Sequence, residues 1–336
     1  MQTAKHMYSS AFHSGSIADK SFLITGGAGF IGSNIAEYLL KYGAGRIVVL
    51  DNLSTGFEEN IKPWLGQADF SFIKGDICDL RTCLNSCERI DYVFHQAALG
   101  SVPRSIKDPL ATNRVNVEGF LNVLIASRDK GVKRVVYASS SSVYGDNADL
   151  PKAEDTIGNA LSPYAVSKRT NELYANVFSK NYSIELIGLR YFNIFGPRQN
   201  PKGEYAAAIP LFMDALLKNK SPFINGDGQQ SRDFTFVENA VQANIKSMFC
   251  SDPKALAQVY NIALGEKTSV NELFSILKNC SGSTSEATYR ESRIGDVRDS
   301  LADISKARRL IGYEPQVKIK EGLDITLNWF RNHFRP

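Results

Sequence analysis

Three glycines spaced by three residues, Gly26, Gly29 and Gly32, constrain the fold of this chain more than any other feature. They directly follow an apolar, β-prone run at residues 22–25 and open an amphipathic stretch at residues 30–41. A strand that turns through glycines into a helix is typical of a βαβ unit whose backbone approaches a phosphate-bearing ligand. Gly26 permits the tight turn, Gly29 the approach of a pyrophosphate, and Gly32 close contact between helix and strand.

The residues around this turn indicate which ligand to expect. Phe30 and Ile31 begin the predicted helix, where free backbone N–H groups favour an anion. Asp51 follows the next β-prone run, where its carboxylate would accept both hydroxyls of an adenosine ribose and repel a 2′-phosphate. We therefore expect a dinucleotide site that takes NAD rather than NADP. The alternative is that Asp51 and Asn52 only open a turn.

Apolar β-prone runs alternate with amphipathic stretches through the first 190 residues. This alternation predicts parallel strands joined by right-handed crossovers, hence an α/β fold with a doubly wound parallel sheet (a Rossmann fold) whose ligand lies outside the carboxyl ends of the strands. We expect strands at 22–25, 46–50, 70–73, 92–95, 135–139 and 186–189, and helices at 30–41, 79–87, 116–130, 163–180, 206–217, 269–277 and 321–330.

The length of 336 residues predicts about two domains. We expect residues 1–20 to form an extension on the surface and residues 21–190 to form the dinucleotide-binding domain. After about Tyr191 the chain becomes richer in Pro, Gly and aromatic loops. We expect residues 191–336 to form a smaller C-terminal substrate-binding (lid) domain, some segments of which return to the first domain.

The composition excludes several classes of function. Thirty-nine basic against 35 acidic side chains leave a net charge of only +4, and no run of Lys or Arg exceeds a pair, so nothing favours nucleic acid or an anionic membrane. No apolar run reaches the roughly 18 residues of a membrane span. The five cysteines show neither Cys-x-x-Cys spacing nor a nearby pair of histidines, which indicates reduced thiols in a cytoplasm and no metal site.

Tyr164 and Lys168 are the most informative chemical pair. Ser162 can cap a helix that starts at Pro163, so the two side chains lie four residues apart on one helix face. The pKa of a tyrosine, about 10, must fall by about three units for the phenol to act as a base near neutrality. A lysine ammonium and a nicotinamide cation, each at about 5 Å, would contribute roughly 3 kcal/mol apiece before screening. The two positive charges together are energetically sufficient to let Tyr164 act as a general base. The alternative is a chance Tyr/Lys pair on a solvated helix face.

Four consecutive serines, at residues 139–142, end the fifth predicted strand, at the edge where a ligand should lie. A serine there can hydrogen-bond the same substrate hydroxyl that Tyr164 deprotonates. The alternative is a polar strand end that caps backbone groups.

The sequence resembles the extended short-chain dehydrogenase/reductase family from Phe22 to about Phe330. Within it, the sequence is most similar to the nucleotide-sugar 4-epimerases, in particular the bacterial UDP-N-acetylglucosamine/UDP-N-acetylgalactosamine 4-epimerases. The motifs that carry the resemblance are the glycine run at Gly26, Asp51-Asn52, Gly75-Asp76-Ile77, His95-Gln96-Ala97-Ala98, residues 139–145, Tyr164 with Lys168, residues 190–193, Arg232-Asp233 and residues 293–296.

The resemblance implies a role for each matching residue. Tyr164 would be the catalytic base, Lys168 would lower its pKa and hold the nicotinamide ribose, and Ser140 would polarise the substrate hydroxyl. The residues implied to bind NAD are Gly26, Gly29, Phe30, Ile31, Gly32, Asp51, Asn52, Asp76, Ile77, Ala97, Ala98, Tyr164 and Lys168. The residues implied to bind a UDP-sugar are Ser101, Ser140, Ser141, Ser142, Asn193, Gln199, Arg232, Arg293, Asp296 and Ser300.

Two serines limit the type of reaction to be expected. The 4,6-dehydratases of this family need a carboxylic acid after the first serine or threonine, whereas Ser141 and Ser142 stand at those places here. Serine hydroxyls cannot carry out that proton transfer near neutrality, which leaves reversible hydride transfer. We expect epimerisation at C4 of a UDP-sugar through a transient 4-keto sugar, with tightly bound NAD.

The resemblance also bears on the sugar. Ser300 occupies a position where a tyrosine restricts some relatives to plain hexoses, and residues 100–105 with Ser141 and Gln199 resemble enzymes that prefer N-acetylated sugars. We expect interconversion of UDP-N-acetylglucosamine and UDP-N-acetylgalactosamine. The alternatives are a UDP-uronic acid 4-epimerase or decarboxylase, with Arg104 near the sugar C6, and a non-catalytic NAD-sensing protein.

The sequence also predicts the oligomeric state. The resemblance, together with the apolar faces of the helices at 116–130 and 163–180, predicts a homodimer through a four-helix bundle.

Overall fold

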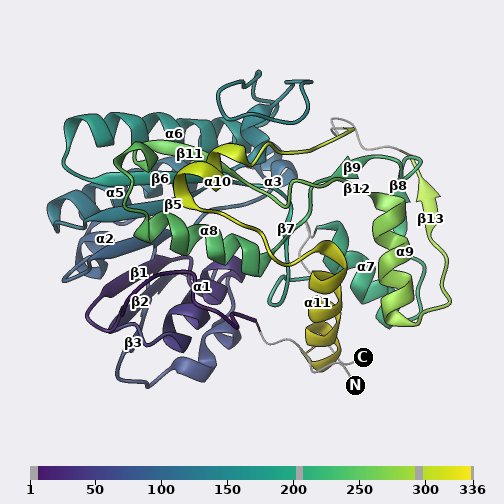
Figure 1. Cartoon of the computed structure of the whole chain (residues 1–336), viewed down its shortest axis with the longest axis horizontal. Coiled ribbons are helices and arrows are strands. Elements are labelled where there is room, and N and C mark those ends of the chain that lie inside the picture. Colours follow the sequence, from purple (N-terminus) through teal and green to yellow (C-terminus); the bar gives the residue numbers. More distant parts are fainter. Residues whose placement is uncertain (1–6, 202–206, 292–297, 334–336) are drawn as a thin grey trace.

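The computed structural model describes residues 7–201, 207–291 and 298–333, and within them the centre is a seven-stranded parallel sheet (Figure 1). Its strands are β1 (Ser21–Thr25), β2 (Arg46–Asp51), β3 (Phe70–Lys74), β4 (Tyr92–His95), β5 (Arg134–Ser140), β6 (Glu185–Tyr191) and β11 (Gln258–Ile262). Their order across the sheet is β11-β6-β5-β4-β1-β2-β3. The expected α/β doubly wound fold is therefore confirmed.

Helices cover both faces of the sheet because the strands are apolar on both faces. In β1, Phe22 and Ile24 belong to one buried cluster and Leu23 belongs to the other. This is the arrangement expected of parallel strands, whose alternate side chains are all buried. The helices of this part are α1 (Phe30–Lys41), α2 (Leu80–Ser86), α3 (Val102–Lys107), α4 (Pro109–Asn113), α5 (Gly119–Asp129), α6 (Pro163–Asn181), α8 (Val237–Phe249) and α10 (Ser305–Ile311).

A third hydrophobic cluster lies apart from the sheet and includes Phe212, Leu273 and Leu327. It is built from the helices α7 (Ala208–Leu217), α9 (Val270–Ser281) and α11 (Ile319–His333), which lie together in Figure 1. The short strands near it are β7 (Ile194–Phe195), β8 (Phe223–Asn225), β9 (Ser231–Arg232), β10 (Thr235–Phe236), β12 (Thr268–Ser269) and β13 (Thr288–Arg290). The division into residues 21–190 and 191–336 stays a prediction.

Two features of the chain differ from the sequence-based expectation. The edge strand β11 was not predicted, and it reaches the sheet from the second range by pairing in parallel with β6. The helix expected at 116–130 begins with a π-helical turn, η3 (Arg114–Glu118), that continues α4. A π-helical turn widens the backbone spiral locally and often marks a functional site.

Residues 1–20 were expected to form an extension on the surface, and in the described part residues 9–11, 14–16, 18 and 19 are exposed whereas three apolar side chains are buried. Tyr8, Phe12 and Ile17 are buried in the same cluster as Tyr38 and Leu39 of α1. The rings of Tyr8 and Phe12 pack against the ring of Tyr38 on α1.

Within the described residues, no helix is long and apolar enough to cross a membrane.

Candidate functional site

A cavity of about 510 Å³ opens at the carboxyl ends of β1, β2, β4 and β5. The strand order reverses between β1 and β4, and ligands of doubly wound sheets bind at such a point. The cavity is lined by Gly26, Gly29, Phe30, Ile31, Gly32, Leu50, Asp51, Asn52, Ser54, Thr55, Gly56, Gly75, Asp76, Ile77, Gln96, Ala97, Ala98, Leu99, Gly100, Val115, Ala138, Ser139, Ser140, Tyr164, Lys168, Tyr191, Asn193, Ile194 and Gln199.

The glycine turn lets the chain after β1 pass close to the chain after β4. Gly26 has a φ of +69°, and a Cβ there would lie 2.6 Å from the backbone nitrogen of Ala97. Only glycine tolerates both the conformation and the contact. The first turn of α1 has neither a side-chain cap nor an acidic residue. Its free N–H groups and positive dipole end therefore face the cavity and suit a pyrophosphate.

Asp51 stands at the end of β2 beside this turn. Its carboxylate accepts hydrogen bonds from the backbone N–H groups of Ala28 (3.0 Å) and Leu53 (2.8 Å). Burial raises the pKa of Asp51, whereas these N–H groups lower it. The carboxylate is thereby held in one orientation at the cavity wall, as a ribose-binding carboxylate requires.

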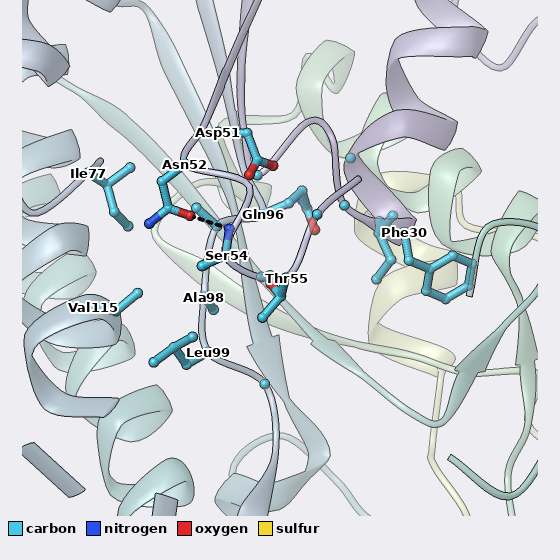
Figure 2. A pocket seen from close by; sticks show the side chains of 18 of the residues that line it. Phe30, Asp51, Asn52, Ser54, Thr55, Ile77, Gln96, Ala98, Leu99 and Val115 are labelled. Atoms are coloured by element: carbon cyan, nitrogen blue, oxygen red, sulfur yellow. Dashed lines mark hydrogen bonds between the residues drawn. The ribbon is translucent and has the colours of Figure 1, made fainter. Parts of the chain in front are cut away.

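The wall next to Asp51 is partly apolar. Figure 2 shows Asn52, Ile77 and Val115 on one side of the cavity and Phe30 on the other. Asn52 donates from Nδ2 to Asp76 (2.9 Å) and accepts from the backbone N–H of Ser54 (2.9 Å). These hydrogen bonds fix the loop after β2 beside the apolar wall of the cavity. A planar base could pack against that wall.

Tyr164, Lys168 and Ser140 meet in the same cavity. Ser162 caps α6 as predicted, accepting from the N–H of Ala165 (3.1 Å). Burial lowers the pKa of Lys168 to about 8, and its Nζ donates to a backbone carbonyl of β5 (2.8 Å). Burial raises the pKa of Tyr164, and a hydrogen bond with Ser140 lowers it. The phenol therefore needs a further positive charge before it can act as a base.

A buried ion pair that sequence reasoning did not single out supports this group. Glu172, one turn after Lys168 on α6, binds Arg190 of β6 through two short contacts (2.8 and 2.9 Å). Glu172 also accepts a hydrogen bond from Ser139 (2.7 Å) and raises the pKa of Lys168. The end of β5 is thus tied to the helix that carries Tyr164 and Lys168.

The π-helical turn positions the opposite wall. Asn116 within η3 accepts from the N–H of Leu99 (2.8 Å) and donates to the carbonyl of Leu99 (3.2 Å) and to Ser167 of α6 (3.1 Å). Asn116 therefore locks the loop after β4 to α6.

A second cavity, of about 650 Å³, adjoins the first, and both are lined by Asn193, Ile194 and Gln199. Its lining combines apolar rings with basic side chains. The aromatic members are Phe195, Phe212, Phe223 and Phe234, and the basic ones are Lys218, Lys220, Arg232 and Arg290. A surface of this kind suits a nucleotide, whose base is planar and whose phosphates are anionic.

The structure brings together most of the residues predicted for the site. All those predicted for NAD, with Ser140, line the first cavity; Asn193 and Gln199 line both cavities, and Arg232 lines the second. Four predicted residues are not among the lining residues of either cavity, namely Ser101, Ser141, Ser142 and Ser300. Ser101 instead caps α3, and the N–H of Ser300 donates to the carbonyl of Ser231 (3.1 Å). Arg293 and Asp296 lie outside the described residues.

Several lining residues were not predicted, among them Ser54, Thr55, Gln96, Leu99, Val115 and Tyr191. Gln96 and Tyr191 follow predicted strands, so their place at the carboxyl edge was a usable signal. Val115 carried no such signal because only the packing of η3 brings it to the cavity.

Comparison with known proteins gives a consistent result. The model of the NAD dependent epimerase/dehydratase family matches residues 22–263. UDP-glucose 4-epimerase of Mycolicibacterium smegmatis is 38% identical over 312 residues, covering 92% of this chain and 98% of the relative. The structure of UDP-N-acetylglucosamine 4-epimerase from Methanobrevibacter ruminantium, in complex with UDP-N-acetylmuramic acid, is 40% identical with a TM-score of 0.88, covering 94% and 99% of the two chains. That of UDP-glucuronic acid 4-epimerase from Bacillus cereus, with UDP-glucuronic acid and NAD, is 32% identical with a TM-score of 0.85, covering 93% and 99%.

Proposed function

The chain belongs to the NAD-dependent epimerase/dehydratase family, and on this premise we propose that it is a UDP-sugar 4-epimerase that interconverts UDP-N-acetylglucosamine and UDP-N-acetylgalactosamine. The observation that carries the proposal is that Tyr164, Lys168 and Ser140 line the same cavity as the glycine turn and Asp51. Proton transfer and hydride transfer need the reacting groups in one place, and this cavity adjoins a second one suited to a nucleotide.

The residues of the first cavity fit NAD. The close approach at Gly26 and the uncapped start of α1 suit its pyrophosphate, and Asp51 suits its adenosine ribose. If bound there, NAD would supply a hydride acceptor and donor and a positive charge. Tyr164 would then lie in the same cavity as that charge, with Lys168 one helical turn away on α6.

The side chains of the chain then divide the proton chemistry between them. Tyr164 accepts the proton of the sugar 4-hydroxyl as C4 is oxidised, and Ser140 donates a hydrogen bond to the same oxygen. Lys168 keeps the phenolate stable. The groups of the second cavity, with Arg232 among them, hold the UDP moiety while the 4-keto sugar turns over. Tyr164 returns the proton when C4 is reduced from the other face.

The choice of an N-acetylated sugar rests on narrower support. It comes from the resemblance of residues 100–105 and Ser300 to enzymes with that preference, and from the similarity to a UDP-N-acetylglucosamine 4-epimerase. The test is to incubate the protein with each of the UDP-hexoses, UDP-N-acetylhexosamines and UDP-uronic acids and to identify products by proton NMR. Fastest turnover of the N-acetylhexosamines supports the proposal, whereas fastest turnover of UDP-glucuronate or UDP-glucose contradicts it.

Ser300→Tyr gives a second test of the sugar preference. We expect it to lower the ratio of activities on N-acetylated over plain sugars by roughly tenfold, because overpacking typically costs about 1–3 kcal/mol and falls on the bulkier sugar. Equal loss on both kinds of sugar would mean that Ser300 does not select between them.

We also propose a homodimer in the cytoplasm. Val166, Leu173 and Val177 lie along one face of α6, and each is more than half exposed. Ile106 of α3 and Leu110 of α4, helices that contact α6, are exposed to 64% and 82%. An apolar surface of this kind is typical of a protein interface. All five cysteines are free, in keeping with a reducing compartment.

A further inference from the structure

The N-terminal segment (residues 7–17) precedes the part matched by the family model, which begins at residue 22. Met7 packs against both the cluster around the sheet and the cluster among α7, α9 and α11. In Figure 1 the segment runs beside α1. The segment therefore contacts both hydrophobic clusters through Met7.

Hydrogen bonds fasten this segment to α1 and α8. The N–H of Tyr8 donates to Glu238 of α8 (2.9 Å), and its carbonyl accepts from the hydroxyl of Tyr42 (2.8 Å). The N–H of Phe12 donates to the hydroxyl of Tyr38 (2.6 Å). Three buried side chains and these hydrogen bonds fix the segment to the folded core, while the residues between them are exposed.

One side chain of the segment reaches further than the others. The Tyr8 hydroxyl donates to Oδ1 of Asn34 (3.0 Å), and Asn34 is fully buried. Nδ2 of Asn34 donates to the carbonyls of Phe30 (2.9 Å) and Pro197 (3.2 Å). The Asn34 amide thus joins three places: the N-terminal segment, the first turn of α1 and the loop at residues 196–199.

That loop needs to be held. Arg198 has a φ of +71°, a left-handed conformation that a side chain makes costly and that persists only where contacts impose it. Arg198 binds Glu37 of α1 (2.5 Å). Its neighbour Gln199 lines both cavities. The position of Gln199 therefore depends on how firmly the loop is fixed to α1.

We infer that Tyr8 is a positioning residue for substrate binding: through Asn34 it holds the loop at residues 196–199, and thereby Gln199, at the junction of the two cavities. Without the Tyr8 hydroxyl, the buried Oδ1 of Asn34 loses its donor, and the amide is no longer held against the Pro197 carbonyl. The loop then relaxes from its left-handed conformation. The inference rests on the proposed function only in taking a UDP-sugar as the ligand.

The test compares Tyr8→Phe with Tyr42→Phe as a matched control. Both variants keep the aromatic ring and lose one hydroxyl group where the N-terminal segment meets α1. Only Tyr8→Phe removes the hydrogen bond to Asn34. We expect similar falls in the thermal midpoint. Only Tyr8→Phe should speed hydrogen exchange in the peptide at residues 194–201 and weaken UDP binding, measured by calorimetry, roughly fivefold, as expected for one hydrogen bond. In an Asn34→Ala background, Tyr8→Phe should change neither quantity further.

Two results overturn the inference: exchange at residues 194–201 that is the same in Tyr8→Phe and Tyr42→Phe, or full effects of Tyr8→Phe in the Asn34→Ala background. Failure of the wild-type protein to bind UDP would instead count against the proposed function. The exchange measurement still decides the role of Tyr8 in that case, since it needs no ligand.

Discussion

Tyr164 shares the first cavity with another half-buried tyrosine, Tyr191, and desolvation raises the pKa of both phenols. Their partners differ. The Tyr191 hydroxyl is held between Gln96 (3.2 Å) and Asn244 (2.7 Å), whereas Tyr164 has a hydrogen bond with Ser140 and stands one helical turn from Lys168. Of the two phenols, Tyr164 stands on the same helix as a lysine one turn away, whereas both hydrogen-bond partners of Tyr191 are uncharged amides.

Tyr164→Phe should lower turnover by at least a hundredfold, because a positioned general base contributes about 10²–10⁴-fold. NAD content, measured after denaturing the purified protein, should not change, since the ring survives. Tyr191→Phe removes a hydroxyl from the same cavity and serves as the control. Activity of Tyr164→Phe within tenfold of wild type would exclude it as the base.

Lys168 carries a stability cost that depends on pH. Its pKa is about 8 in the folded protein and 10.5 in the unfolded chain. Between pH 8 and 10.5 Lys168 holds its proton in the unfolded chain but not in the folded protein. The free energy of unfolding therefore rises with pH across this range. Below pH 8 the buried ammonium costs about 3 kcal/mol, offset by roughly 1 kcal/mol from its hydrogen bond.

Lys168→Met, freed of NAD, should therefore be about 2 kcal/mol more stable than wild type at pH 7, and the difference should shrink between pH 8 and 10.5. Urea unfolding at pH 7, 8.5 and 10 measures this. A difference that does not change with pH would mean that Lys168 keeps its ordinary pKa in the folded protein.

The start of the helix α6 is fixed by its first residues. Pro163 begins the helix and Ser162 caps it, with extended backbone at the cap. Because Tyr164 follows the cap by two residues, the geometry of the first turn sets where the phenol lies. The cap thus serves both the stability of α6 and the placement of Tyr164, the proposed base.

Ser162→Ala should cost about 1 kcal/mol of unfolding free energy, as for other N-caps, and should lower kcat more than it raises KM. Ser162→Asp is the matched variant, since an aspartate caps as well as a serine. Chemical denaturation and steady-state kinetics on both variants check this. Equal kinetics for the two variants would show that the cap does not position Tyr164.

The exposed apolar face of α6 is where we expect two copies of the chain to meet. Charges buried in an apolar interface are costly, so Leu173→Glu and Val177→Glu together should convert a dimer into a monomer. Light scattering at micromolar concentration measures the mass. Leu65→Glu, which changes a side chain 40% exposed near β3, is the control and should leave the mass unaltered. A wild-type monomer, or a dimer that survives the double change, would contradict the proposed interface.

The amino-acid sequence alone predicts the doubly wound sheet, the glycine turn and the Tyr164 pair. The turn, the pair and each predicted strand and helix depend on residues close together in the chain, so periodicity, capping and turn chemistry suffice to predict them, and their alternation predicts the sheet. The match is close in α1, which spans the predicted residues 30–41.

The remaining features depend on contacts between residues that are far apart in the chain. The strand β11 joins β6 across some seventy residues, and Tyr8 reaches Glu238 across 230. Local sequence shows that β11 and the N-terminal segment each contain a few apolar residues, but many apolar surfaces compete for burial in a chain of this length. Which of them meet is settled by the packing of the whole core, because burial stabilises every such contact and has no direction of its own.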